Sequence, residues 1–434
     1  MADLGAIDAA LRRSREVDEW ITSARRERRL AREVGAARVR RMAETTTVDG
    51  MVFRDLRRGR GAARFAASGD EAAAALVHDA AERAALSVGP PWHLSPPSAP
   101  ARAPAADDQA FADPDAAVTA LTDALLGAVS AANVATTRLA ISLVAGEHEL
   151  RTSAGLARTY RDTRFDVSAT LIQRPNAAQP HAQPVRLRAR RADDLAIQAE
   201  ITRAATLLVD RARAAPLAPG PCDVLLTGTA LADPADRGYG LWQPLVAQAN
   251  ATAARRGLSR YRIGQSIYGE SRPSGEAITV RSDGTLAYGL RSAPLGELGE
   301  PVRPFDLVRA GVAAGHPLGL IEAALAGEAA NGGARNLIIE SGPSPVGALS
   351  EPGSRRLIEI VELGFLDVDA GTGDFSAAVR LGYTGPDRSP VTGALLRGNL
   401  FDALLRARFS RETTVRGWYY GPEAIRLDAL AISS

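Results

Sequence analysis

The histidines are the residues of this chain best suited to metal chemistry. A catalytic zinc site needs imidazole nitrogens, thiolates or carboxylates that converge on one ion, and a hydrolytic one also needs a carboxylate that accepts a proton from the bound water. The five histidines lie far apart along the chain, and no His-Glu-x-x-x-His pattern occurs. Only Glu147-His148-Glu149 forms a local cluster, which we interpret as a solvated sheet edge rather than a ligand set. The pattern therefore predicts no catalytic and no metal-binding residue.

Other nucleophiles and phosphate-binding groups are equally poorly supported. The single cysteine, Cys222, follows Pro221 without a nearby histidine, which favours a small buried or boundary thiol. All 52 basic residues are arginine, so there is no lysine for a Schiff base or a P-loop. The glycine-containing segments 341–345 and 371–373 lack the spacing of a phosphate-binding loop, and we expect turns there. An independent hydrolase is disfavoured.

Two further segments could take part in chemistry or binding. Asp374 follows Gly373 and could be an acid–base group, but we interpret it as a turn residue whose carboxylate accepts local backbone N–H bonds. The aromatic run Trp418-Tyr419-Tyr420 stands on an expected strand. It could line an interface or a substrate tunnel, because aromatic residues are enriched in interface cores. Ordinary core packing explains it at least as well.

Composition limits the class of protein. The chain has 434 residues, of which 46% are hydrophobic and 24% charged, which is typical of two to three globular domains. No apolar run of about 18 residues predicts a membrane span. The N-terminal segment carries Asp3 and Asp8 rather than a basic, then apolar, signal. We therefore expect a cytoplasmic protein without a membrane partner.

Charge does not favour a nucleic-acid partner. The net charge is only +2. Basic residues cluster at 25–29 and 38–41, but a glutamate interrupts the first cluster. Such a mixture of signs indicates a solvated surface with ion pairs more than a nucleic-acid face.

The elements that would position these residues differ between the two halves of the chain. The first half predicts helices and strands in turn, with Asp49-Gly50 as a hairpin turn. The expected elements are helices at 5–34, 70–86, 115–132 and 193–214, a β-rich segment at 36–66, strands at 137–144 and 164–173, and a proline-rich linker or surface loop at 89–114. The prolines at 216–221 indicate a domain boundary.

The second half predicts short strands with inserted helices. The expected strands are 224–226, 277–280, 336–340 and 377–381, and the expected helices are 241–256, 306–314, 318–328 and 354–363. The predicted fold class is α+β with two domains. They are an N-terminal α/β two-layer domain at 1–215 and a C-terminal β-rich domain with inserted helices at 222–434.

Several segments of the second half resemble the TldD/PmbA peptidase family in the same order along the chain. They are a strand at 223–226 before a helix, Asn336-Leu-Ile-Ile-Glu-Ser-Gly342, Thr372-Gly-Asp-Phe-Ser376 and Gly398-Asn-Leu400. The turn at 152–155 is a weaker match in the first half. Several moderately specific motifs in the family's order are stronger evidence for the resemblance than any one motif alone.

The resemblance also indicates which kind of subunit this is. The family has TldD-type subunits with a zinc-binding His-Glu-x-x-x-His helix and TldE (PmbA) subunits that lack it. The segment similar to that helix, 241–256, offers only Asn250 as a ligand-type residue. The chain therefore resembles a TldE/PmbA-like non-catalytic subunit.

The resemblance implies an assembly rather than a lone enzyme. A TldD-like zinc-binding subunit would be the partner in a heterodimer, with zinc in the partner and no cofactor in this chain. The two subunits would enclose a cavity in which unstructured or modified peptides, including natural-product precursors, are cleaved on the partner's side. The alternative is a non-proteolytic peptide- or protein-binding regulator of the same fold.

The same resemblance suggests candidate motif or cavity residues, all in the second half of the chain. They are Gly373, Asp374, Phe375, Ser376, Gly398, Asn399, Trp418 and Tyr419.

Overall fold

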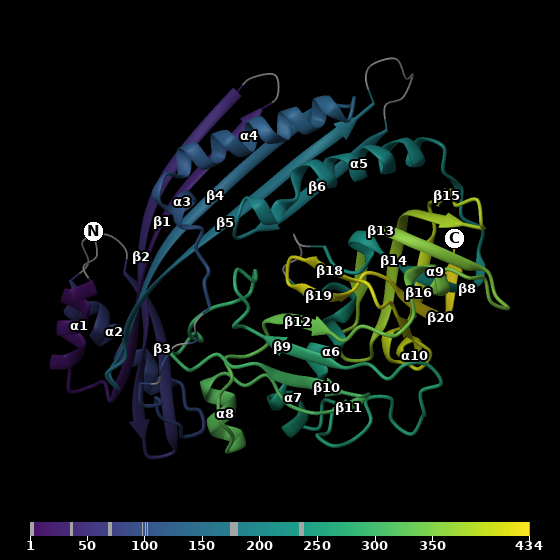
Figure 1. The fold of residues 1–434 in the computed structure, drawn as a ribbon. Helices are drawn as coiled ribbons and strands as arrows, with labels where there is room; N and C mark the ends of the chain where they lie inside the picture. The colour runs from purple at the N-terminus through teal and green to yellow at the C-terminus, as the bar shows by residue number, and fades with distance from the viewer. Residues whose placement is uncertain are drawn as a thin grey trace.

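The computed structural model describes residues 4–433 apart from 35–37, 68–71, 98, 100, 102, 174–180 and 234–237. The described chain mixes helices with many strands, as Figure 1 shows, so the predicted α+β class is confirmed. The exact domain bounds stay a prediction.

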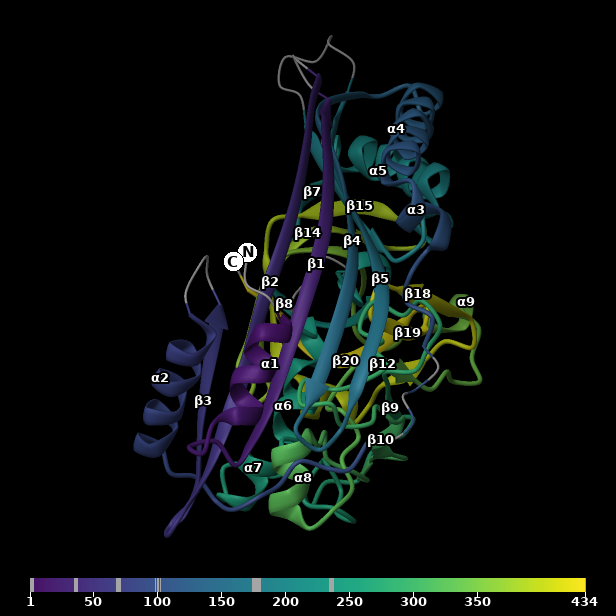
Figure 2. The ribbon, with the colours of Figure 1, turned by 90° about the vertical axis from the view of Figure 1, so that its left-hand side faces the viewer.

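The N-terminal part is one antiparallel sheet of six long strands with the order β3-β2-β1-β4-β5-β6. Its strands are β1 (Glu19–Val34), β2 (Arg38–Leu56), β3 (Gly59–Ala67), β4 (Ala135–Thr152), β5 (Ala157–Ile172) and β6 (Ala182–Ala189). Its helices are α1 (Leu4–Arg13), α2 (Ala73–Leu86), α3 (Asp108–Ala112), α4 (Pro114–Ala131) and α5 (Ile197–Ala212), the last preceded by a 3₁₀ turn at Asp193–Leu195. Figure 2 shows β2, β1, β4 and β5 side by side, with α4 and α5 beside their outer half.

One face of this sheet is apolar and carries the helices. Leu30, Ile141 and Val167 pack in one core with Val118 of α4 and Leu208 of α5. Because successive side chains of a strand point to opposite faces, the residues between them form a second face without these helices.

The prediction of one helix over 5–34 is wrong beyond residue 13. The segment from Glu19 to Val34 is strand β1, hydrogen-bonded to β2 on one side and β4 on the other. Its alanines, arginines and glutamates favour helices individually, but pairing along both edges outweighs that local preference.

The predicted hairpin turn at Asp49-Gly50 is also wrong. Gly50 lies within β2 opposite Thr22, and the chain turns later, between Leu56 and Gly59. A Cβ at Gly50 would lie 2.4 Å from the Ile21 carbonyl oxygen and 2.5 Å from the Phe65 ring. The glycine gives space for close packing rather than a turn.

The C-terminal part contains two further sheets. One has the order β11-β10-β9-β12-β19-β18, and the other β13-β8-β20-β16-β14-β15-β7, with β17 paired to β20. The strands of the first are β9 (Val280–Asp283), β10 (Phe305–Arg309), β11 (Val312–Ala313), β12 (Asn336–Ile339), β18 (Thr413–Arg416) and β19 (Tyr419–Pro422). Those of the second are β7 (Ala215–Pro216), β8 (Gly220–Leu226), β13 (Leu357–Val368), β14 (Asp374–Thr384), β15 (Ser389–Thr392), β16 (Leu395–Asn399), β17 (Arg408–Phe409) and β20 (Ile425–Ser433).

Short helices complete this part, and one large core joins both sheets. The helices are α6 (Gln243–Gln248), α7 (Ala251–Arg255), α8 (Leu320–Ala326), α9 (Val346–Leu349) and α10 (Leu400–Leu404), with 3₁₀ turns at Gly228–Ala230 and Gly240–Trp242. None of the described helices is long and apolar enough to cross a membrane.

Two expected helices of this half are strands instead. Residues 306–314 fall in β10 and β11, and residues 354–363 fall largely in β13. β13 pairs with β8 and β14 and buries Ile358 and Ile360 by alternation, a pattern set by neighbours distant in sequence. The helix expected at 241–256 is divided into α6 and α7, and the strand expected at 277–280 begins only at Val280.

The proline-rich segment 89–114 runs between the two parts of the molecule. Trp92 and Leu94 are buried with Phe53 of β2 and Leu320 of α8. Its described residues before Asp108 belong to no helix or strand, as the prolines predict, and the short helix α3 follows.

Candidate functional site

A groove lies between the N-terminal sheet and residues Leu295–Leu298 of the C-terminal part, and Leu76 and Arg83 of α2 line one side of it. Its volume is about 720 Å³. A second cavity of about 490 Å³ adjoins it, since Met51, Arg64, Glu297 and Leu298 line both. Ile21, Leu150 and Leu295 give the groove apolar walls between its charged groups.

Sheet register places four polar side chains side by side in this groove. Thr47, Arg25, His148 and Tyr160 are direct neighbours on β2, β1, β4 and β5. All four line the cavity. The groove therefore presents hydrogen-bonding groups across four strands, which suits a ligand that lies over the sheet.

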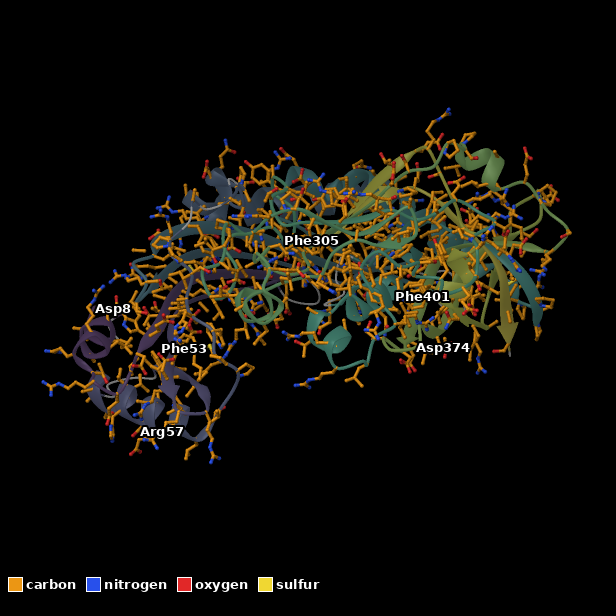
Figure 3. The ribbon with its side chains drawn as sticks, turned by 90° about the horizontal axis from the view of Figure 1, so that it is seen from below. Asp8, Phe53, Arg57, Phe305, Asp374 and Phe401 are labelled. Carbon is orange, nitrogen blue, oxygen red and sulfur yellow. The ribbon has the colours of Figure 1, made fainter. Side chains whose placement is uncertain are left out.

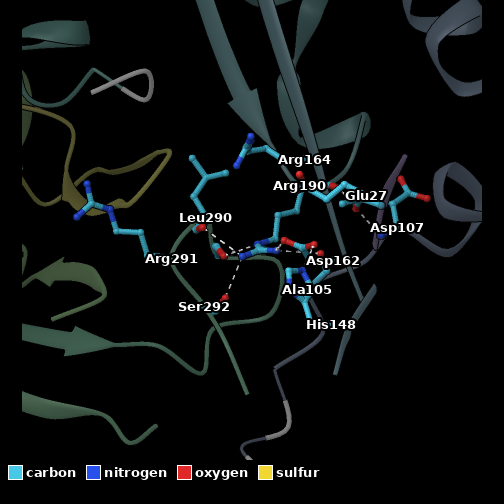
Figure 4. Close-up of polar contacts among 12 residues, drawn as sticks. Glu27, Ala105, Asp107, His148, Asp162, Arg164, Arg190, Leu290, Arg291 and Ser292 are labelled. Atoms are coloured by element: carbon cyan, nitrogen blue, oxygen red, sulfur yellow. Dashed lines mark hydrogen bonds and ion pairs between the residues drawn. The ribbon is translucent and has the colours of Figure 1, made fainter. Parts of the chain in front are cut away.

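His148 is held by a polar cluster that joins three strands of the sheet (Figure 4). Its Nε2 donates to the Asp162 Oδ1 over 2.8 Å, and the Tyr160 ring stacks on the imidazole with centroids 4.6 Å apart. Arg190, just beyond β6, lies 3.3 Å from the other Asp162 oxygen. The imidazole therefore has a fixed orientation.

Arg190 also binds the C-terminal part. Its guanidinium donates to the backbone carbonyls of Gly289, Leu290 and Ser292, and to that of Ala105 in the proline-rich segment. Its side chain is 9% exposed. Arg190 thus connects the wall of the groove to the 289–292 loop.

The cluster keeps Asp162 ionised. Burial raises the pKa of Asp162, but the hydrogen bond and charge of His148 and the charge of Arg190 outweigh burial, so the pKa is lowered overall. Burial also lowers the pKa of Arg190 and raises that of Tyr160. Of these residues His148 and Tyr160 line the groove, whereas Asp162 and Arg190 do not. Asp162 and Arg190 therefore act by fixing the orientation of His148.

The interpretation of Glu147-His148-Glu149 as a sheet edge is wrong. β4 lies between β1 and β5, and the His148 side chain is only 16% exposed. Sequence reasoning missed Asp162 and Arg190 because they lie 14 and 42 residues further along the chain. The available signal was Gly146, two residues before His148 within a strand.

Gly146 makes the space in which the pair meets. A Cβ at this position would lie 2.5 Å from Asp162 Oδ1 and 2.9 Å from His148 Nε2. We expect Gly146→Ala to separate the pair and lower the free energy of unfolding by about 1–3 kcal/mol, as measured by urea denaturation.

Gly127→Ala is the matched control. Gly127 is exposed within α4, and a Cβ there would meet nothing within 4 Å. It should stabilise the protein by about 0.5–1 kcal/mol through helix propensity. Equal effects of the two substitutions would contradict the role given to Gly146.

The candidate residues around Asp374 lie elsewhere. Figure 3 places Asp374 and Phe401 at the opposite end of the molecule from Asp8 and Phe53. The Asp374 carboxylate accepts hydrogen bonds from the Asn399 amide and the Thr372 hydroxyl, at 2.8 and 2.9 Å, and these bonds lower its pKa. Its partners are thus side chains, not the backbone N–H groups expected.

The other candidate residues of that region lie in the turn before β14 or on the paired strands β14 and β16. Gly373 has a φ of +85° and packs against the Phe401 ring, so a side chain there would be strained. Phe375 and Ser376 lie on β14 opposite Gly398 and Arg397 of β16. A Cβ at Gly398 would lie 2.3 Å from Leu430.

Trp418 and Tyr419 are buried in the C-terminal core. Trp418 is 1% exposed and Tyr419 is 0% exposed. Tyr239 meets the Trp418 ring edge-on, and the Arg291 guanidinium lies over both rings. Both aromatic side chains therefore pack against other residues of this chain.

The helical segment at 241–256 uses its polar side chains internally. Gln248 donates to the carbonyls of Ala370 and Gly371, and its Oε1 accepts from the Arg260 backbone N–H. Asn250 caps α7 by accepting from the Ala253 N–H. Among the described residues, no group of three or more His, Cys, Asp or Glu side chains could hold a metal ion.

Cys222 is a buried residue of β8. Burial raises the pKa of its thiol to about 11. The thiolate, which is the reactive form, is therefore disfavoured at neutral pH.

Comparison with known proteins gives one family and several similar folds. Residues 227–434 match the model of the PmbA/TldA metallopeptidase C-terminal domain. None of the curated proteins matches.

The solved structures cover almost the whole chain. TldE from Thermococcus kodakarensis is 17% identical with a TM-score of 0.78, covering 99% of this chain and 100% of its own. A Thermotoga maritima protein described as a modulator of DNA gyrase is 17% identical with a TM-score of 0.76, covering 96% of each chain. A Bacteroides thetaiotaomicron protein with a similar description is 14% identical with a TM-score of 0.78, covering 99% of this chain and 97% of its own. At these identities the likeness establishes the fold.

Proposed function

Because the chain belongs to the TldD/PmbA family through residues 227–434, we propose that it is the metal-free, TldE-like subunit of a heterodimeric zinc peptidase. A TldD-like homologue would carry the zinc and cleave unstructured or modified peptides, including natural-product precursors. This chain would shape the enclosed cavity and support its partner. A cytoplasmic location is part of the same proposal.

The main support for the proposal is that side chains of the segment 241–256 are buried or hydrogen-bonded within the chain. This is the segment similar to the zinc-binding helix of TldD-type subunits. Here Leu245 and Trp242 are buried in the core, Gln248 ties the segment to the 370–371 loop, and Asn250 caps α7. These side chains have structural partners within the chain.

The groove gives the proposal a place for peptide. It combines apolar walls with the row Thr47, Arg25, His148 and Tyr160. Such a surface can hold an extended chain through side-chain contacts without breaking any bond. Peptide would be positioned here and cleaved by the partner.

Co-purification with a zinc-binding homologue tests the proposal. We expect one complex on size-exclusion chromatography, zinc in the homologue, and cleavage of an unstructured peptide such as casein only when both chains are present. Cleavage by this chain alone with added zinc, or failure to form a complex, would contradict the proposal.

A second candidate is a non-proteolytic regulator that binds a peptide or protein. The descriptions of the Thermotoga and Bacteroides structures as modulators of DNA gyrase favour it. This function predicts stable binding of a target protein that is recovered intact after incubation with both chains.

A further inference from the structure

The outer half of the N-terminal sheet carries a surface rich in arginine on its helix-free face. In one row across the sheet, Arg29, Val144 and Arg164 are neighbours on β1, β4 and β5. In the next row, Ser142 lies beside Asp166, which is opposite Arg188 of β6. We call this surface the arginine face; its basic residues are Arg29, Arg41, Arg138, Arg164, Arg186 and Arg188.

The period of two along each strand explains why these residues share one face. Leu30 and Ile141 pack under α4 and α5, so their neighbours in sequence point the other way. The side chains between the arginines are small, among them Ala31, Ala43 and Ala140. They leave space between the arginine side chains for an extended chain.

Carboxylates neutralise only part of this charge. Arg164 and Arg188 share Asp166, and Arg138 lies 3.8 Å from Glu33. The remaining three arginines are exposed and form no ion pair with a described residue; they are Arg29, Arg41 and Arg186. The face therefore has a positive surplus although the whole chain has a net charge of only +2.

We propose that the arginine face binds extended acidic peptide segments and leads them into the groove. Guanidinium groups bind carboxylates through two parallel hydrogen bonds. Alternate residues of a strand lie about 6.5–7 Å apart, the spacing at which alternate side chains of an extended peptide also project. The inference rests on the proposed function, because it names the class of peptide that such a subunit would select.

The mixture of charges favours a peptide over a nucleic acid. Asp166 and Glu33 lie among the arginines and would repel a continuous row of phosphates. The small aliphatic and hydroxyl side chains between them offer no ring for base stacking. An acidic peptide can place neutral residues opposite these carboxylates.

The arginine face adjoins the groove along strand β1. Arg25 lines the groove and lies four residues before Arg29 on the same face of β1, with its ion-pair partner Glu27 between them. The two positions are about 13 Å apart along the strand. A peptide of a few residues therefore spans from the arginine face to His148.

Binding to the full chain tests the proposal. Fluorescence anisotropy would compare a labelled 14-residue Glu-Ser repeat, a Gln-Ser repeat of the same length and a single-stranded DNA of 14 nucleotides. We expect the Glu-Ser peptide to bind at least about tenfold more tightly than the Gln-Ser peptide, with affinity falling as salt rises.

The triple variant Arg29→Gln/Arg41→Gln/Arg186→Gln should lose about tenfold or more in affinity for the Glu-Ser peptide. The control Arg255→Gln/Arg256→Gln/Arg411→Gln removes the same charge from exposed positions of the C-terminal part, and its affinity should change less than about twofold. Equal losses in both variants would overturn the proposal. Tighter binding of DNA than of the Glu-Ser peptide, or no peptide binding, would also overturn it.

The same variants separate this inference from the proposed function. If the chain binds the Glu-Ser peptide but forms no complex with a zinc-binding homologue, the inference stands and the proposed function fails. If the complex forms but the triple variant supports cleavage of acidic and neutral peptides at unchanged relative rates, the proposed function stands and the inference fails.

Discussion

Replacing Arg190 with methionine is expected to lower the free energy of unfolding by about 2–4 kcal/mol, because it removes the more buried partner of an ion pair of which Asp162 stays 22% exposed. The substitution leaves Asp162 without its guanidinium partner. It also removes the side-chain donor of the Leu290 and Ser292 carbonyls, and it leaves Gly289 only the Ser292 amide as a donor. Urea denaturation measures the change.

Arg186→Met is the matched control, since Arg186 lies on β6 four residues earlier but is exposed. This substitution should change the free energy of unfolding by no more than about 0.5 kcal/mol. Hydrogen exchange adds a local readout: Arg190→Met should speed exchange of the Ser292 amide, which donates to Gly289. Equal destabilisation by both variants would show that Arg190 does not connect the two parts of the molecule as described.

Replacing Trp418 with alanine is expected to lower the free energy of unfolding by about 3–5 kcal/mol, as for other buried tryptophans. The side chain is 1% exposed and packs against Tyr239 and Tyr419. Its Nε1 has no hydrogen-bond partner among the described residues, so the loss comes from packing. Thermal and urea unfolding measure it.

Phe365→Ala provides the comparison for Trp418. Phe365 is an aromatic residue of β13 that is 54% exposed, and its truncation should change stability by less than about 0.5 kcal/mol. If Trp418→Ala kept full stability but abolished cleavage by the two-chain complex, Trp418 would line a substrate path instead of the core.

The two parts of the molecule meet through polar as well as apolar contacts. Glu362 of β13 accepts from Gln183 of β6 and Arg211 of α5, at 3.0 and 2.6 Å. Tyr383 of β14 donates to Asp210 over 2.6 Å. Together with Arg190, these bonds position the sheet, and hence the groove, relative to the C-terminal part.

Sequence patterns predicted secondary structure correctly where the contacts that stabilise an element are local in sequence. The helices at 70–86 and 115–132 appear as α2 and α4. Capping residues, such as Asp113 before α4, act within one turn of the chain. Patterns failed at 19–34 and 357–363, where pairing with distant strands decides between helix and strand.

The sequence by itself determined the absence of lysine, the dispersal of the histidines and the ordered motifs of the second half that indicate the TldD/PmbA family. Only the tertiary structure decided that His148, Asp162 and Arg190 form one cluster and that six arginines share one sheet face. The physical reason is strand register. It sets which side chains are neighbours through hydrogen bonds between segments that are tens of residues apart, and no local pattern contains that pairing.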